Sequence, residues 1–158
     1  IHELEHAGED TPPEVYLELE YSGFIPEDYI DEPIAKMGVY KRIAGISSPE
    51  ELEQVAAELE DRYGPMPDEV HSLLSLAEIR IMCGKLYIAS MRERRGTLQV
   101  EFARVAKVEP DRVLRLIRES GGKVKLDPRN PHVLLMDTGG IGLKEKSEFL
   151  RSRLATLV

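Results

Sequence analysis

The clearest hydrophobic pattern of the chain lies between Ser47 and Gly64. Apolar residues recur there at about 100° per residue and form one stripe: Leu52, Val55, Ala56, Leu59 and Tyr63. Ser48 followed by Glu51 is a capping box, and Pro49 suits a first helical position. Gly64 is typical of a helix end. The pattern predicts one helix whose outer side is polar and mostly acidic, with Glu50, Glu51, Gln54, Glu58 and Asp61.

Helical periodicity also appears before this segment, over Pro33–Ala44. Asp31 is the expected N-cap of that helix. Apolar or long side chains recur on its successive turns: Ile34, Met37, and Tyr40 or Lys41.

Three more helices are expected after Gly64. Residues 67–86 are apolar over so much of the helix circumference that we expect a central helix packed on two sides. Residues 110–120 form a shorter amphipathic helix, and residues 143–157 close the chain as another. We expect the last helix to bury Leu143, Leu150, Leu154, Leu157 and the aliphatic stem of Lys146.

Strand patterns with a period of two occupy the remaining segments. Residues 14–20 alternate as in a half-buried strand. Residues 88–93 and 97–102 flank a glycine-containing loop and predict a hairpin. Residues 123–127 and 132–137 predict a second one. Helices precede the hairpins, so the expected fold is a compact single α+β domain.

Charge is distributed unevenly along the 158 residues. The net charge is −8, but residues 1–62 carry 17 acidic and 4 basic side chains, a net −13, whereas residues 63–158 carry a net +5. An acidic surface repels the phosphates that dominate DNA binding. It suits a basic patch on another protein.

The sequence also limits the expected location. No apolar run approaches the roughly 18 residues of a membrane span, and no secretory signal is visible. Cys83 is a lone cysteine, which fits a reducing compartment. We therefore expect a cytoplasmic protein. The start at Ile1 rather than Met predicts a piece of a longer chain, with residues 1–13 as a polar linker.

Candidate catalytic and cofactor motifs are weak. His2 and His6 are four residues apart but lack a third ligand at a recognisable spacing, so no metal site is expected. Residues 139–142 are glycine-rich and precede Lys144, but the P-loop spacing is missing, and we expect a turn. Cys83 lies in an apolar helix where thiols are usually inert. We expect no cofactor and no catalytic activity, although a site assembled from residues distant in sequence stays open.

Arginine clusters provide a second interpretation of the surface. They lie at the first hairpin tip and along one predicted helix: Arg92, Arg94, Arg95, Arg112, Arg115 and Arg118. Such clusters can hold phosphates, so an auxiliary nucleic-acid-binding module is the alternative function. No aromatic residues are interleaved with them in the sequence, which disfavours stacking on single-stranded bases.

Three segments together resemble a known family. They are residues 25–30 (IPEDYI), 40–44 (YKRIA) and 58–67 (ELEDRYGPMP). Their order and separation are similar to those in the C-terminal domain of the bacterial transcription-repair coupling factor, Mfd. The resemblance covers roughly residues 14–158 and is strongest over residues 25–86.

The resemblance implies a regulatory role for residues 14–158, with residues 1–13 as the linker from an upstream motor region. The family's parent protein is an ATP-driven DNA translocase that displaces stalled RNA polymerase and recruits UvrA. In the family, this domain packs on the N-terminal UvrB-like module, masks the surface that UvrA would use, and restrains the motor until polymerase is engaged.

The resemblance also suggests which residues bind the partner. In the family, arginines of the UvrB-like module contact an acidic position just before the Asp-Arg-aromatic-Gly turn, which corresponds here to Glu58. Helical spacing adds Asp61, Gln54 and Glu51 to the same face. Tyr40, Arg42, Arg62 and Tyr63 are expected mainly to stabilise the fold.

Overall fold

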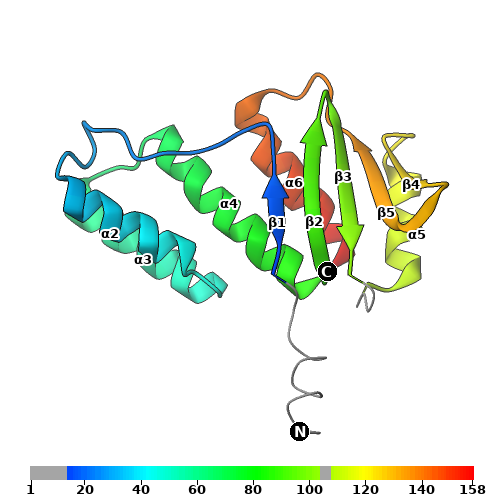
Figure 1. Ribbon diagram of the computed structural model, residues 1–158, viewed down its shortest axis with the longest axis horizontal. Coiled ribbons are helices and arrows are strands. Elements are labelled where there is room, and N and C mark those ends of the chain that lie inside the picture. Colours follow the sequence, from blue (N-terminus) through cyan, green and yellow to red (C-terminus); the bar gives the residue numbers. More distant parts are fainter. Residues whose placement is uncertain (1–13, 104–107) are drawn as a thin grey trace, which may run out of the picture.

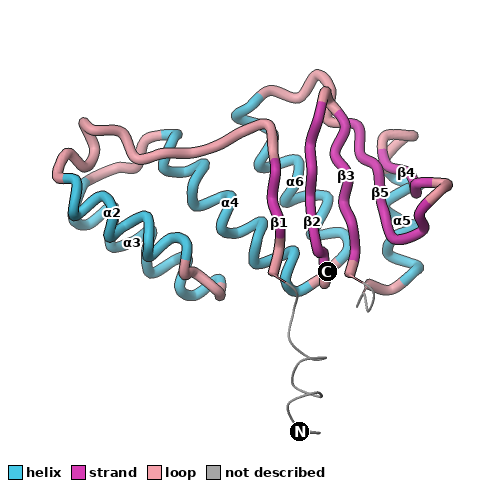
Figure 2. The backbone as a smooth tube through the Cα atoms, viewed as in Figure 1, coloured by secondary structure: helices cyan, strands magenta, loops and turns pink. Residues whose placement is uncertain are grey.

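A five-stranded sheet forms one layer of the molecule (Figures 1 and 2). The computed structural model describes residues 14–103 and 108–158. The strand order is β1-β2-β3-β5-β4, in which β1 runs parallel to β2 and the other neighbours are antiparallel. The strands are β1 (Tyr16–Glu18), β2 (Ile88–Arg94), β3 (Thr97–Phe102), β4 (Val124–Asp127) and β5 (Asn130–Asp137).

Helices form the second layer. They are α2 (Pro33–Ala44), α3 (Pro49–Tyr63), α4 (Asp68–Lys85), α5 (Pro110–Glu119) and α6 (Leu143–Leu157). Figure 1 shows α4, α5 and α6 behind the sheet, with α2 and α3 beside α4 and away from the strands. The predicted α+β class is therefore confirmed. None of the described helices is long and apolar enough to cross a membrane.

The central helix α4 contributes to two hydrophobic cores, as its broad apolar surface predicts. Ile79 and Cys83 are buried in the core between the sheet, α5 and α6. Val70, Leu74 and Ala77 are buried in a second core with α2 and α3. Because α4 belongs to both cores, it fixes the α2–α3 pair relative to the sheet.

The first hairpin closes through a tight turn at Arg95 and Gly96. Both residues have positive φ, at 51° and 78°, which matches a two-residue turn between antiparallel strands. Strand β2 continues to Arg94, one residue further than predicted, and β5 starts at Asn130 rather than at residue 132. Strand β1 is shorter than predicted, and its parallel pairing with β2 was not predicted at all.

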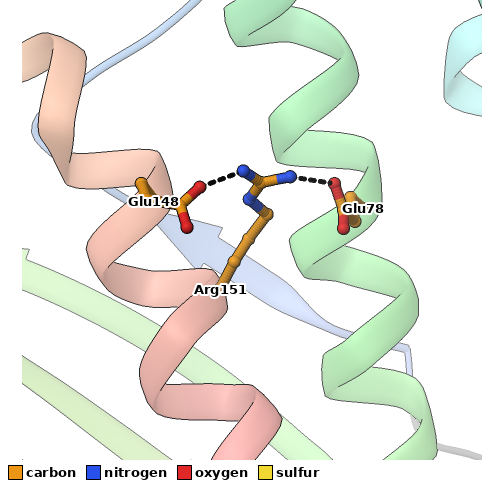
Figure 3. A network of polar contacts seen from close by, with 3 residues as sticks. All are labelled: Glu78, Glu148 and Arg151. Atoms are coloured by element: carbon orange, nitrogen blue, oxygen red, sulfur yellow. Dashed lines mark hydrogen bonds and ion pairs between the residues drawn. The ribbon is translucent and has the colours of Figure 1, made fainter.

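Helix α6 is attached to the rest of the domain by polar contacts as well as by leucines. The Arg151 guanidinium lies between α6 and α4 and contacts Glu78 at 3.0 Å and also Glu148 (Figure 3). The Lys146 ammonium lies 2.9 Å from Glu93 of β2, and the two side chains are only 7% and 1% exposed. The prediction that only the stem of Lys146 is buried is therefore wrong.

Helix α2 differs from its prediction in two respects. Glu32, not Asp31, is the N-cap, and its carboxylate accepts hydrogen bonds from the amides of Ile34 and Ala35. The recurring apolar residues do not mark the buried face. Ile34 is 81% exposed and Met37 is 60% exposed, whereas Ile43 is buried.

Candidate partner-binding surface on α3

Helix α3 contains the four residues that are predicted from the sequence to bind a partner. Local interactions define both ends of this helix. The hydroxyl of Ser48 accepts a hydrogen bond from the Glu51 amide at 3.2 Å. The Glu51 carboxylate accepts from the Ser47 amide and hydroxyl, rather than from the Ser48 amide of a standard capping box. At the other end Gly64 has a φ of 91°, a conformation that favours glycine.

The three motif segments converge around this helix. The Tyr40 hydroxyl of α2 accepts a hydrogen bond from the Ile25 amide at 2.8 Å. The Tyr29 hydroxyl donates to the carbonyl oxygens of Leu59 and Gly64, at 3.2 and 2.9 Å. These bonds join residues 25–30 to α2 and to the end of α3. The three motif segments therefore position the acidic face of α3 through these hydrogen bonds.

Glu58 is paired within the chain, with Arg42 of α2. The Arg42 guanidinium donates to the Glu58 carboxylate, and both side chains are about half exposed, at 49% and 48%. This contact lowers the pKa of Glu58 below its ordinary value, and a hydrogen bond from Gln54 acts in the same direction. Because the pair is solvent-exposed, an incoming cation can reach the same carboxylate.

Asp61 extends the face with a free carboxylate. It is exposed, and within the described residues no ion pair or side-chain hydrogen bond engages it. At 3.6 residues per turn, Gln54, Glu58 and Asp61 project within about 60° of one another on the outer side of α3. Glu51 lies at the same side but uses its carboxylate at the helix start. The structure therefore brings all four predicted residues onto one exposed face, with Asp61 the most available.

Aromatic side chains pack at the C-terminal end of α3. The rings of Tyr29 and Tyr63 are 5.7 Å apart and tilted by 52°, and the Arg62 guanidinium lies 5.4 Å from the Tyr63 ring centre. These contacts agree with the expected structural role of Tyr63 and Arg62. Arg42 has a more specific role than predicted, because it neutralises the central carboxylate of the candidate surface.

The arginine clusters are largely engaged by neighbouring side chains. Arg94 pairs with Glu18 at 3.1 Å, and Arg92 lies 5.1 Å from the ring centre of Tyr16. On α5, Arg115 pairs with Glu119 at 3.0 Å, and Arg112 contacts Glu109. One aromatic ring thus does accompany an arginine, although from a distant part of the sequence. Within residues 14–103 and 108–158, these carboxylates neutralise part of the positive charge of both clusters, which weakens their attraction for phosphates.

Other candidate chemistry finds little support within the described residues. Cys83 is fully buried, and burial raises the pKa of its thiol to about 12, so it lacks the properties of a reactive cysteine. No group of His, Cys, Asp and Glu side chains within residues 14–103 and 108–158 is arranged to hold a metal ion. His2 and His6 lie outside those ranges. Residues 139–142 form the turn before α6 that the sequence predicts.

Comparison with protein families identifies the domain. The model of the TRCF domain matches residues 19–113, which include all three motif segments and the whole of α2 and α3. The chain belongs to the TRCF domain family.

Several transcription-repair-coupling factors are similar to this TRCF domain. The protein from Borreliella burgdorferi is 28% identical over 144 residues, which cover 91% of the chain and 13% of that protein. The Escherichia coli protein is 31% identical over 117 residues, which cover 74% of the chain and 10% of that protein. The chain therefore spans about a tenth of the length of these relatives.

The fold also matches a solved structure. The crystal structure of the C-terminal domain of a transcription-repair coupling factor superposes with a TM-score of 0.83, covers 93% of both chains, and is 21% identical in sequence. At this identity the match supports the fold of the TRCF domain.

Sequence reasoning missed two features of this surface. It did not find the pairing of Arg42 with Glu58, because the two residues are 16 positions apart and on different helices. It also did not find the exposure of Ile34 and Met37. The amphipathic pattern of α3 could have suggested the pairing of Arg42 with Glu58, because an acidic helix face attracts an arginine on the adjacent helix.

Proposed function

We propose that this TRCF domain is a non-catalytic autoinhibitory domain of a cytoplasmic transcription-repair coupling factor. It packs on the UvrB-like module of the same protein, masks the surface that UvrA uses, and restrains the ATP-driven DNA translocase. Engagement of RNA polymerase releases this contact between the two domains, which we call the clamp. The partners of the whole protein are then RNA polymerase, UvrA, DNA and ATP.

The exposed acidic face of α3 is the observation that carries this proposal. Asp61 has a free carboxylate, and Glu58 is held by the half-exposed Arg42 and by a hydrogen bond from Gln54 on the same helix. Arginines of a partner can therefore bind this face without breaking a buried interaction. Solvent-exposed ion pairs are weak individually and give orientation more than affinity. A tether within one chain raises the effective concentration, so a weak contact can remain mostly closed and still open when polymerase binds.

Charge reversal at Glu58 in the full coupling factor tests the proposal. Glu58→Arg removes the carboxylate and places two arginines side by side, so the closed state should weaken. We expect a several-fold rise in basal ATPase activity and in UvrA binding. Glu53→Arg, with the same charge change on another side of α3, is the matched control and should leave both quantities unchanged.

A charge swap separates loss of the partner contact from loss of the contact inside the domain. The double variant Arg42→Glu/Glu58→Arg restores an ion pair between α2 and α3 but still lacks a carboxylate at position 58. If the clamp depends on the carboxylate of Glu58, the double variant remains activated. If it returns to wild-type ATPase activity and UvrA binding, then Glu58 acts only by stabilising the fold, and the proposed clamp surface is wrong.

A further inference from the structure

The outer side of α2 presents apolar side chains to solvent. Ile34 is 81% exposed and Met37 is 60% exposed, although both are on a regular helix that buries Ile43 against the second core. Large apolar side chains in such positions are informative when they are grouped, because a grouped patch often marks an interaction site. We call Ile34, Met37, Gly38 and Lys41 the outer stripe of α2.

Glycine at position 38 strengthens this interpretation. A Cβ atom added to Gly38 would meet nothing within 4 Å, and its φ is not in the left-handed region, so the fold of this domain gives no reason for a glycine there. Glycine in the middle of a helix is destabilising relative to alanine. Its absence of a side chain leaves bare backbone beside Ile34, one turn away, onto which a partner can pack closely.

The outer stripe is continuous with the acidic face of α3. On a helical wheel at 100° per residue, Arg42 and then Gly38 lie between the buried face of α2 and Ile34. Arg42 is in contact with Glu58 of α3. A path across the surface therefore runs from Asp61 and Glu58, over Arg42 and Gly38, to Ile34 and Met37.

Carboxylates also occur in the chain just before the stripe. Glu27, Asp28 and Asp31 are exposed in the segment that precedes α2, and the described residues offer them no ion-pair partner. Carboxylates thus occur both in the segment that precedes the stripe and on α3, across Arg42 from it. Lys41 adds its alkyl chain to the middle of the stripe. A complementary partner presents apolar side chains that are flanked by arginines or lysines.

We propose that the outer stripe of α2 is the apolar anchor of the same interface, and that it binds apolar side chains beside the arginines of the UvrB-like module. This inference rests on the proposed function. The carboxylates of α3 and of residues 27–31 orient the partner, whereas Ile34 and Met37 supply most of the affinity. Protein interfaces commonly combine a desolvated apolar centre with a charged rim in this way.

Nuclear magnetic resonance with the purified UvrB-like module of the same parent tests the inference. The 158-residue chain carries ¹³C-labelled methyl groups, and the module is added to millimolar concentration, so that a weak untethered contact is still detected. We expect the methyl resonances of Ile34 and Met37 to shift, and that of the buried Ile43 to move least. Ile34→Ser/Met37→Ser should weaken binding at least tenfold and keep the wild-type salt dependence. Leu114→Ser, at an exposed leucine on α5, should bind like the wild type.

Each outcome distinguishes the two proposals. If Asp61→Arg weakens binding and the Ile34→Ser/Met37→Ser variant binds like the wild type, the apolar anchor is wrong and the acidic clamp stands. If no resonance shifts at millimolar module, both the anchor and the proposed function are overturned. Loss of binding in both variants, with a reduced salt dependence only for Asp61→Arg, supports both.

Discussion

The guanidinium of Arg42 on α2 donates a hydrogen bond to the carboxylate of Glu58 on α3. The central acid of the proposed clamp is therefore already paired in the isolated domain. A partner arginine must either share the Glu58 carboxylate with Arg42 or displace Arg42 from it. The intrachain pair would therefore compete with the proposed contact between domains and keep that contact weak and reversible.

Removal of this competition should strengthen the clamp. In Arg42→Gln the Glu58 carboxylate loses its ion-pair partner, so we expect affinity for the UvrB-like module to rise by two- to fivefold. The pKa of Glu58 should rise toward its ordinary value, because Arg42 is the main cause of its lowering. Calorimetry measures the affinity, and carboxyl ¹³C titration measures the pKa. Arg62→Gln is the control, since Arg62 lies on Tyr63. Weaker binding by Arg42→Gln would show that Arg42 helps to hold the partner.

The buried pair of Lys146 and Glu93 should be important for stability. Lys146→Met leaves the Glu93 carboxylate buried without its cation, and such a change typically costs about 3 kcal/mol. Glu93→Gln/Lys146→Met removes both charges and should recover part of that loss. Urea denaturation measures both variants. Equal stability of Lys146→Met and the wild type would mean that the ammonium does not stabilise the native position of α6.

The same pair predicts a pH dependence. Burial alone would raise the pKa of Glu93, but the Lys146 ammonium and the hydrogen bond from the Glu20 amide together lower it below its ordinary value of 4.5. The unfolded chain therefore takes up this proton at a higher pH than the folded chain does. The stabilising contribution is complete above the unfolded pKa and is lost as the pH falls through the lowered, folded pKa. Glu93→Gln should flatten the stability curve below about pH 4.5, as thermal unfolding at pH 3 to 6 would show. An unchanged slope would contradict the lowered pKa.

Tyr29 should stabilise the end of α3 through its hydroxyl. Tyr29→Phe keeps the ring against Tyr63 but removes the donor to the carbonyl oxygens of Leu59 and Gly64. We expect a loss of about 1 kcal/mol in the free energy of unfolding. Tyr16→Phe is the control, because its hydroxyl makes an exposed contact with Glu18 and should be worth less than about 0.5 kcal/mol. Equal effects of the two substitutions would argue against the role of Tyr29.

Two glycines should respond to alanine in opposite directions. A Cβ atom at Gly23 would lie 2.4 Å from the Leu73 amide nitrogen and 2.6 Å from the Glu69 carbonyl oxygen, both on the backbone of α4. Gly23→Ala should therefore destabilise the domain by about 1–3 kcal/mol. Gly38→Ala points into open space on a helix and should stabilise it by about 0.5–1 kcal/mol. Thermal unfolding measures both, and a destabilising Gly38→Ala would mean that the fold itself needs this glycine.

The ends of several helices could be predicted because they depend on residues that are close together in the sequence. Ser48, Pro49 and Gly64 define the ends of α3 through contacts within a few residues, so the sequence contains the information. Helix α6 begins and ends where its periodicity predicts, at Leu143 and Leu157. The broad apolar surface of α4 likewise indicates that it has neighbours on two sides.

Contacts between distant segments could not be predicted in the same way. The parallel pairing of β1 with β2 joins residues more than 70 positions apart, and so does the hydrogen bond from the Glu20 amide to Glu93. Periodicity predicted that α2 is a helix but not which face is buried. Ile43 and its smaller neighbours Ala35 and Val39 face the core, while the larger Ile34 and Met37 face solvent.

The most direct test of the acidic clamp is calorimetric titration of the domain with the UvrB-like module of its own parent, as wild type, Asp61→Arg and Glu53→Arg. Asp61 has a free carboxylate, so its reversal changes the surface without breaking an ion pair inside the domain. We predict that Asp61→Arg weakens binding at least tenfold and that Glu53→Arg binds like the wild type. Equal affinity of Asp61→Arg and the wild type would contradict the central claim that the outer face of α3 binds the module.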